Sequence, residues 1–105
     1  MFHVLIALAD GEKHGYAIIK EVARRTGGSL KLGAGTLYAL IRRFVEDGVI
    51  EESSNRPDPA LDDERRRYYR LTEFGRAVAA AEAGRLEELI RMAREKRLVP
   101  SAARG

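Results

Sequence analysis

The sequence predicts a mainly α-helical domain of the α+β class, with one small β-hairpin and a long final helix. The middle of the chain repeats apolar residues at the three- and four-residue spacing of a helix with one buried face. These residues are Leu37, Leu40, Ile41, Phe44 and Val45. Two short β-prone segments, 49–54 and 66–71, flank a loop that contains two prolines, which indicates a hairpin.

Two helices are expected before the central one. Residues 2–9 are apolar on nearly all sides and predict a short helix that is buried over most of its surface. A second helix is expected from about Tyr16 to Arg25, and His14 lies at its start. Residues 30–32 alternate between apolar and charged, which predicts a short strand.

The hairpin and the final helix follow the central helix. Residues 55–64 are expected to form the hairpin loop, because its prolines cannot donate hydrogen bonds to a ladder. Thr72 is a natural N-cap for a helix that runs to about Leu98. The element order is helix, helix, strand, helix, hairpin, long helix, which is the order of a winged helix-turn-helix domain with a two-stranded wing.

The central helix presents an unusually smooth outer face. Gly35, Thr36 and Ala39 leave the start of that face nearly bare of side chain, and Arg42 and Arg43 follow in the next turn. Such a face fits a helix that presses against a large anionic surface, and backbone N–H groups at its start can hold a phosphate. An ordinary surface helix with a glycine-rich start is the alternative interpretation.

The last helix carries an apolar stripe that a small domain cannot easily cover. A second copy of the chain is the expected cover, although the helix could also fold back onto its own domain. The stripe predicts a dimer interface at Val78, Leu86, Leu89, Ile90 and Ala93. The expected division is a winged-helix domain over 1–72, a dimerisation helix over 73–98 and a disordered tail over 99–105. Glu87 and Arg91 are expected to pair at i, i+4.

Four separated motifs resemble the PadR family of bacterial and archaeal transcriptional regulators, over roughly residues 1–80. The motifs are His14-Gly15-Tyr16, the GTLY at 35–38, the arginine pair 42–43 followed by 47–50, and 67–73 followed by Gly75. The resemblance implies a winged-helix homodimer that binds a palindromic operator and commonly represses transcription. This sequence departs from the family at Ala39, where proline is usual, and in a long wing.

The resemblance also assigns roles to single residues. Tyr16 and Tyr38 stand where family members often contact the DNA backbone, and Thr36 stands at the reading end of the recognition helix. Arg66 and Arg67 stand at the base of the wing, where we expect them to touch phosphates. The acidic wing tip should stay in water, and its residues are Asp58, Asp62, Asp63 and Glu64.

These roles define an expected mode of DNA binding. The helix 36–47 enters the major groove, where Gly35 and Ala39 allow close approach and Thr36, Arg42 or Arg43 reach base edges or phosphates. Lys20, Tyr16 and Tyr38 would fix the register on the backbone. Two alternatives stay open: Tyr38 as an aromatic at the edge of the core, and Arg43 as the partner of Asp47.

Other classes of function find little support in the sequence. The sequence has only two histidines, no cysteine and no glycine pattern after a strand. It therefore predicts no enzyme, no metal site and no nucleotide cofactor. A net charge of +3 is only mild support for a nucleic-acid partner. The runner-up is therefore a winged-helix module that binds protein and not DNA. We expect a cytoplasmic location without a membrane partner, and an unidentified small-molecule effector stays open.

Overall fold

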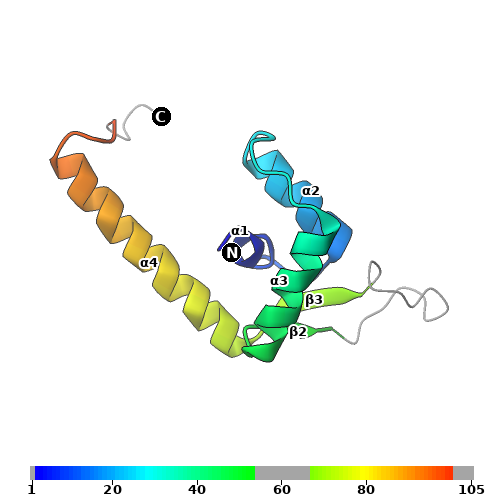
Figure 1. Ribbon diagram of the computed structural model, residues 1–105. Helices are drawn as coiled ribbons and strands as arrows, with labels where there is room; N and C mark the ends of the chain where they lie inside the picture. Colours follow the sequence, from blue (N-terminus) through cyan, green and yellow to red (C-terminus); the bar gives the residue numbers. More distant parts are fainter. Residues whose placement is uncertain (1, 54–66, 101–105) are drawn as a thin grey trace.

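The computed structural model describes residues 2–53 and 67–100. Within these residues, a compact body of three helices and a small sheet carries a fourth helix that projects from one side (Figure 1). The elements are α1 Phe2–Ala7, β1 Lys13–His14, α2 Gly15–Arg25, α3 Ala34–Glu46, β2 Ile50–Glu52, β3 Tyr68–Leu71 and α4 Glu73–Glu95. This arrangement is the mainly helical winged-helix architecture that the periodicity predicts. The predicted hairpin loop and the end of the tail lie outside the described residues.

One hydrophobic core joins the three helices of the body to the sheet. Helix α3 contributes Leu37, Leu40, Ile41 and Phe44 of its predicted apolar stripe, but Val45 is 43% exposed because it lies at the outer edge of that stripe. The least exposed large residues of the core are Val4, Leu8, Ile18, Leu37 and Ile50. Helix α1 is less buried than expected, because Ile6 on its outer face is 44% exposed.

The sheet has three antiparallel strands in the order β1-β3-β2, one more than the predicted hairpin. Lys13 pairs with Tyr69, and Ile50 pairs with Leu71 on the other side of β3. The prediction of a strand at residues 30–32 was wrong. Leu32 is buried and Leu30 half-buried, so the alternation reflects an extended loop that packs on the core.

The helix ends agree closely with the sequence. His14 caps α2, because its Nδ1 accepts a hydrogen bond from the backbone N–H of Ala17 over 3.1 Å. Thr72 caps α4 by accepting from the backbone N–H of Gly75 over 2.8 Å. Helix α4 ends at Glu95, three residues earlier than predicted. Two residues later, Arg97 takes a left-handed φ of 63°.

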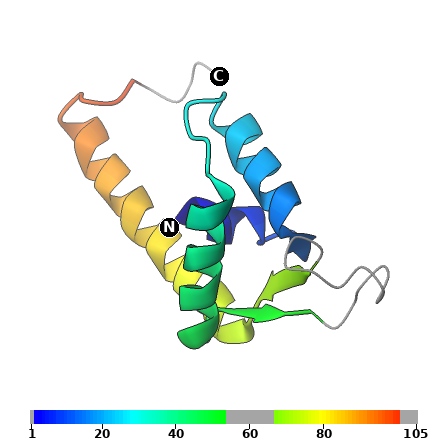
Figure 2. The same cartoon turned by 45° about the vertical axis from the view of Figure 1, so that its right-hand side comes forward.

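Only the first turns of α4 pack on the body, against α1 and β3. The rest of the helix leans away from α1 and α2, as the view in Figure 2 also shows. The helix therefore does not fold back onto its own domain. The predicted pair of Glu87 and Arg91 does not form. Arg91 instead bonds to Glu88 and, over 2.6 Å, to Glu95, because both lie within reach on the same side of the helix.

Candidate nucleic-acid interface

Helix α3 packs one face into the core and leaves the other face open. Leu37, Tyr38 and Ile41 are buried, which fixes the rotation of the helix about its own axis. The outer face is exposed at Gly35, Thr36, Ala39, Arg42 and Arg43. The predicted combination of a smooth start and two arginines is therefore present on one solvent-facing surface, which we call the α3 outer face.

The start of α3 has the backbone arrangement expected of an anion-facing helix end. Gly33 is the N-cap and offers no side-chain hydrogen bond to the first turn. The first helical bond between backbone groups runs from Leu37 N to Gly33 O. The positive end of the helix dipole thus lies beside the exposed Gly35 and Thr36, where a phosphate oxygen could accept from backbone N–H groups.

Arg43 belongs to the open surface and not to an intrahelical pair. Among residues 2–53 and 67–100, no ion pair joins Arg43 to Asp47. The alternative that left Arg43 as a partner of Asp47 therefore finds no support in this structure.

Tyr38 is not on the α3 outer face. Its side chain is only 8% exposed and belongs to the hydrophobic core. The close approach of α2 explains this position: a Cβ added at Gly15 would lie 2.3 Å from the Tyr38 hydroxyl oxygen. This position supports the alternative interpretation of Tyr38 as an aromatic residue at the edge of the core.

Helix α2 packs against α3 and adds two exposed side chains that were predicted to contact DNA. Tyr16 is 59% exposed, although a large aromatic side chain is usually buried. The ammonium group of Lys20 lies 5.3 Å from the centre of the Tyr16 ring, a cation–π contact. This contact places both side chains next to each other on the exposed surface of α2.

The base of the wing is more acidic than the sequence suggested. Arg67 lies half-buried, with its Nε 3.7 Å from a carboxylate oxygen of Glu52. Arg70 donates to Glu51 over 2.8 Å across the same pair of strands. A phosphate contact by Arg67 would therefore compete with Glu52. Arg66 and the acidic tip lie outside the described residues.

Two contacts hold the sheet to the start of α2, and sequence reasoning missed both. The Ser53 hydroxyl donates to Glu12 over 2.7 Å, although 41 residues separate them. The ring of His14 meets the ring of Tyr68 edge-on, with centroids 5.4 Å apart. Residue patterns at short range cannot reveal such pairs. The strand at 13–14 has only two residues, both polar, so it shows no alternation that the sequence could reveal.

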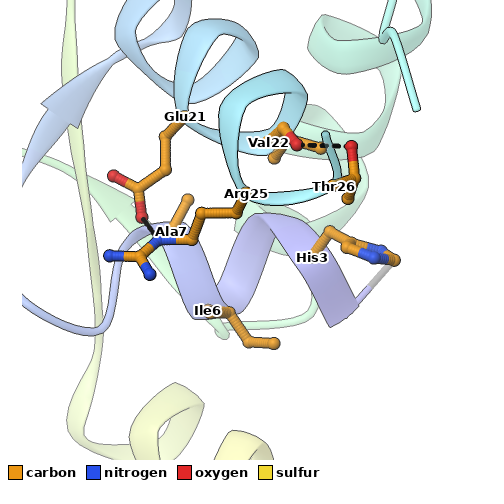
Figure 3. Close-up of a pocket in the computed structure, with 7 residues that line it drawn as sticks. All are labelled: His3, Ile6, Ala7, Glu21, Val22, Arg25 and Thr26. Atoms are coloured by element: carbon orange, nitrogen blue, oxygen red, sulfur yellow. Dashed lines mark hydrogen bonds and ion pairs between the residues drawn. The ribbon is translucent and has the colours of Figure 1, made fainter. Parts of the chain in front are cut away.

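A pocket of about 220 Å³ lies between α1 and α2 (Figure 3). Figure 3 shows an ion pair between Glu21 and Arg25 on one side, with 2.9 Å between Nε and the carboxylate, and His3 on the other. Its remaining lining residues are Ile6, Ala7, Val22 and Thr26. None of them belongs to the α3 outer face.

The described residues contain no cluster of histidine and acidic side chains that could hold a metal ion. In the same part of the chain, no helix combines the length and apolar character needed to cross a bilayer.

Comparison with known proteins decides the family. Residues 4–81 match the model of the transcriptional regulator PadR-like family, which is about three quarters of the chain. The chain belongs to the PadR-like family. The match includes the α3 outer face, the sheet and the first turns of α4. The apolar residues beyond position 81 of α4 lie outside it.

Solved structures with the same fold include members of this family. A PadR family transcription regulator from Clostridium difficile is 26% identical, with a TM-score of 0.70 over 90% of this chain and 95% of that one. A transcriptional regulator from Clostridium thermocellum is 23% identical, with a TM-score of 0.73 over 90% and 88% of the two chains. Bacillus subtilis PadR, solved in complex with operator DNA, is 20% identical, with a TM-score of 0.65 over 78% and 45%.

Two curated relatives are themselves uncharacterized. A protein of Lysinibacillus sphaericus is 32% identical over 74 residues, which are 70% of this chain and 65% of the relative. A 37.1 kDa protein in a transposon of Streptomyces fradiae is 35% identical over 86 residues, 82% of this chain and 22% of the relative. The chain thus spans about two thirds of one relative's length and about a fifth of the other's.

Proposed function

We propose that this PadR-like chain is a sequence-specific DNA-binding transcriptional regulator, a repressor that binds a palindromic operator as a homodimer. The α3 outer face carries the proposal. Its opposite face is anchored in the core by Leu37 and Ile41, while Gly35, Thr36 and Ala39 lie exposed beside two arginines. A small, smooth helix face can approach base edges closely, and an arginine there can bond to a guanine in bidentate fashion.

The remaining contacts would fix the position of the protein on the duplex. Tyr16 and Lys20 project from α2, which packs against α3, and are suited to phosphates on the flank of the groove. Arg67 has a smaller role than the sequence suggested, because Glu52 partly neutralises its charge. Arg66 stays a predicted contact at the base of the wing.

The second copy would be held by α4, so that residues 73–98 serve as the dimerisation helix. Beyond its first turns this helix runs away from the body of its own chain (Figures 1 and 2). Leu89, Ile90 and Met92 are 45%, 43% and 43% exposed, and Leu86 and Ala93 are half-buried beside them. Burial of such a stripe against a second α4 removes apolar surface from water and places two α3 helices on one duplex, about 34 Å apart.

The test is binding to duplexes selected from a random library, measured over a range of salt concentrations. Each phosphate contact contributes a slope of about −0.9 to log K against log salt, so several contacts give a steep fall. We expect Arg42→Ala to weaken discrimination by about 1–3 kcal/mol per affected base pair. Arg94→Ala, on the far part of α4, is the matched control and should leave both discrimination and slope unchanged.

A second variant tests close approach. Ala39→Leu enlarges the α3 outer face without touching the core, so it should fold as the wild type does yet lose operator binding. Ala80→Leu makes the same change at an exposed position of α4 and should bind normally. A wild-type protein that selects no duplex sequence, or binds with a flat salt response, would favour a protein-binding module instead.

A further inference from the structure

The first turn of α4 is bonded directly to the end of α3. The Thr72 hydroxyl donates to the carbonyl oxygen of Gly48 over 2.6 Å and accepts from the N–H of Gly75. The backbone N–H of Thr72 donates to Val49 O over 3.0 Å. One threonine side chain therefore bonds both to the turn that closes α3 and to the turn that opens α4.

The second part of this contact is a backbone-to-backbone approach. A Cβ added at Gly75 would lie 1.9 Å from Val49 O, closer than any side chain allows. Gly75 is the one buried residue that α4 contributes within the described chain. Because both partners are backbone, neither can rotate away, and the start of α4 has little freedom to tilt here.

The third part holds α4 to α1. The Arg76 guanidinium donates from Nη2 to the carbonyl oxygen of Ala9 over 3.0 Å, across 67 residues of chain. This carbonyl lies just after the end of α1. Thr72 and Gly75 on one side and Arg76 on the other thus bracket the first turn of α4. In Figure 1 this turn begins beside the end of α3.

We propose that Thr72, Gly75 and Arg76 form a rigid joint that sets the angle between α3 and α4 and thereby selects the spacing between operator half-sites. This inference rests on the proposed function. A dimer held through its α4 helices can place two α3 helices on one duplex only at the separation that this angle dictates. One added base pair moves a half-site by about 3.4 Å and turns it by about 34°, so a rigid joint penalises the wrong spacing.

The rigidity is tested without DNA. The chain has no cysteine, so Glu46→Cys on α3 and Glu87→Cys on α4 supply the only two thiols for spin labels. Labelled chain is diluted with unlabelled chain, so that pulsed electron resonance reports the distance within one chain. We expect a narrow distribution that broadens with Arg76→Ala and with Thr72→Val. Arg94→Ala and Thr72→Ser, which retains the hydroxyl, should leave it narrow.

The selection of spacing is tested with duplexes that carry two half-sites at increasing separations, and with a single half-site. For Arg76→Ala we expect the affinity ratio between the best spacing and one two base pairs longer to fall about tenfold. Affinity for the single half-site should stay unchanged. Arg94→Ala should retain the wild-type ratio.

The two experiments separate the possible failures. Distributions that stay narrow in both Arg76→Ala and Thr72→Val overturn the rigid joint. Broadened distributions with an unchanged spacing ratio overturn its role in selecting half-sites. A wild-type protein that binds no half-site contradicts the proposed function and with it the spacing role, while the distances still decide whether the joint is rigid.

Discussion

At the scale of single residues, two glycines of α4 have opposite meanings. Gly75 lies against the backbone of Val49, whereas a Cβ at Gly84 would meet nothing within 4 Å. Glycine in a helix interior is unfavourable by about 1 kcal/mol relative to alanine. At Gly75 the close contact with Val49 offsets the lower helix propensity of glycine. Gly84 has no contact of this kind in the described chain.

This difference gives a matched pair of substitutions. Gly75→Ala should lower the free energy of unfolding by about 1–3 kcal/mol, because its methyl group forces α4 away from Val49. Gly84→Ala should raise it by about 0.5–1 kcal/mol, because the helix gains a better helix former in open space. Urea denaturation at one fixed protein concentration measures both. Equal stability of the two variants would contradict the close packing at Gly75.

Tyr38 illustrates why a residue on a helix cannot be assigned from its motif alone. It lies next to the exposed Ala39 in sequence, yet the absence of a side chain at Gly15 lets its ring pack into the core. A helical wheel places such a residue at the boundary between two faces. Only the position of α2 decides which face receives it.

At the scale of elements, α4 is stabilised locally along its exposed length. Arg85 bonds to Glu82 over 2.7 Å, and Arg91 bridges Glu88 and Glu95. Exposed pairs of this kind contribute only a few tenths of a kcal/mol each. They support a helix that has few tertiary contacts, and they leave its apolar stripe available for a partner.

The apolar stripe gives the prediction that tests the dimer. Leu89→Glu places a charge in the proposed interface and should convert a dimer into monomers in sedimentation velocity, because a buried unpaired carboxylate is strongly unfavourable. Ala80→Glu introduces the same charge at an exposed position and should leave the dimer intact. A wild-type protein that sediments as a monomer would remove the dimer from the proposal.

The end of α4 gives a second prediction for this element. Arg97 has a φ of 63° and follows the last helical turn, while Leu98 N donates back to Ala93 O over 2.9 Å. Helices commonly end with this geometry, and the residue at the left-handed position is then usually glycine. Arg97→Gly should stabilise the protein by about 1 kcal/mol. Arg94→Gly, inside the helix, should destabilise it by about 1 kcal/mol, and thermal denaturation followed by circular dichroism compares them.

At the scale of the whole molecule, exposed carboxylates make stability depend on pH. A hydrogen bond from Lys13 lowers the pKa of Asp10, and one from Arg85 lowers the pKa of Glu82. A hydrogen bond from Arg91 likewise lowers the pKa of Glu88. These groups release protons more readily in the folded chain, so their contribution is complete above the usual values of 3.8 for Asp and 4.5 for Glu.

We therefore expect the urea midpoint at low salt to fall as the pH drops below about 4.5. The decline should be modest, because all three carboxylates are on the surface and salt screens them. The variant that combines Asp10→Asn, Glu82→Gln and Glu88→Gln should show a smaller decline from pH 7 to pH 3. An identical decline in the two proteins would show that other groups cause the acid sensitivity.

The sequence by itself determined the local features of the molecule. Periodicity located α2, α3 and α4, His14 and Thr72 marked two helix starts, and the spacing of small residues and arginines predicted the exposed face of α3. Each of these signals depends on residues within about two turns of one another, so a single stretch of sequence contains all the information.

Only the tertiary structure decided the features that join distant segments. Four features depend on where another element packs. They are the third strand at 13–14, the burial of Tyr38, the pairing of Arg67 with Glu52 and the contact of Gly75 with Val49. Which strands pair, and where two backbone segments come close, depends on the three-dimensional arrangement of the chain. The physical reason is that packing and hydrogen bonding act over a few ångströms in space, whatever the separation of the residues in sequence.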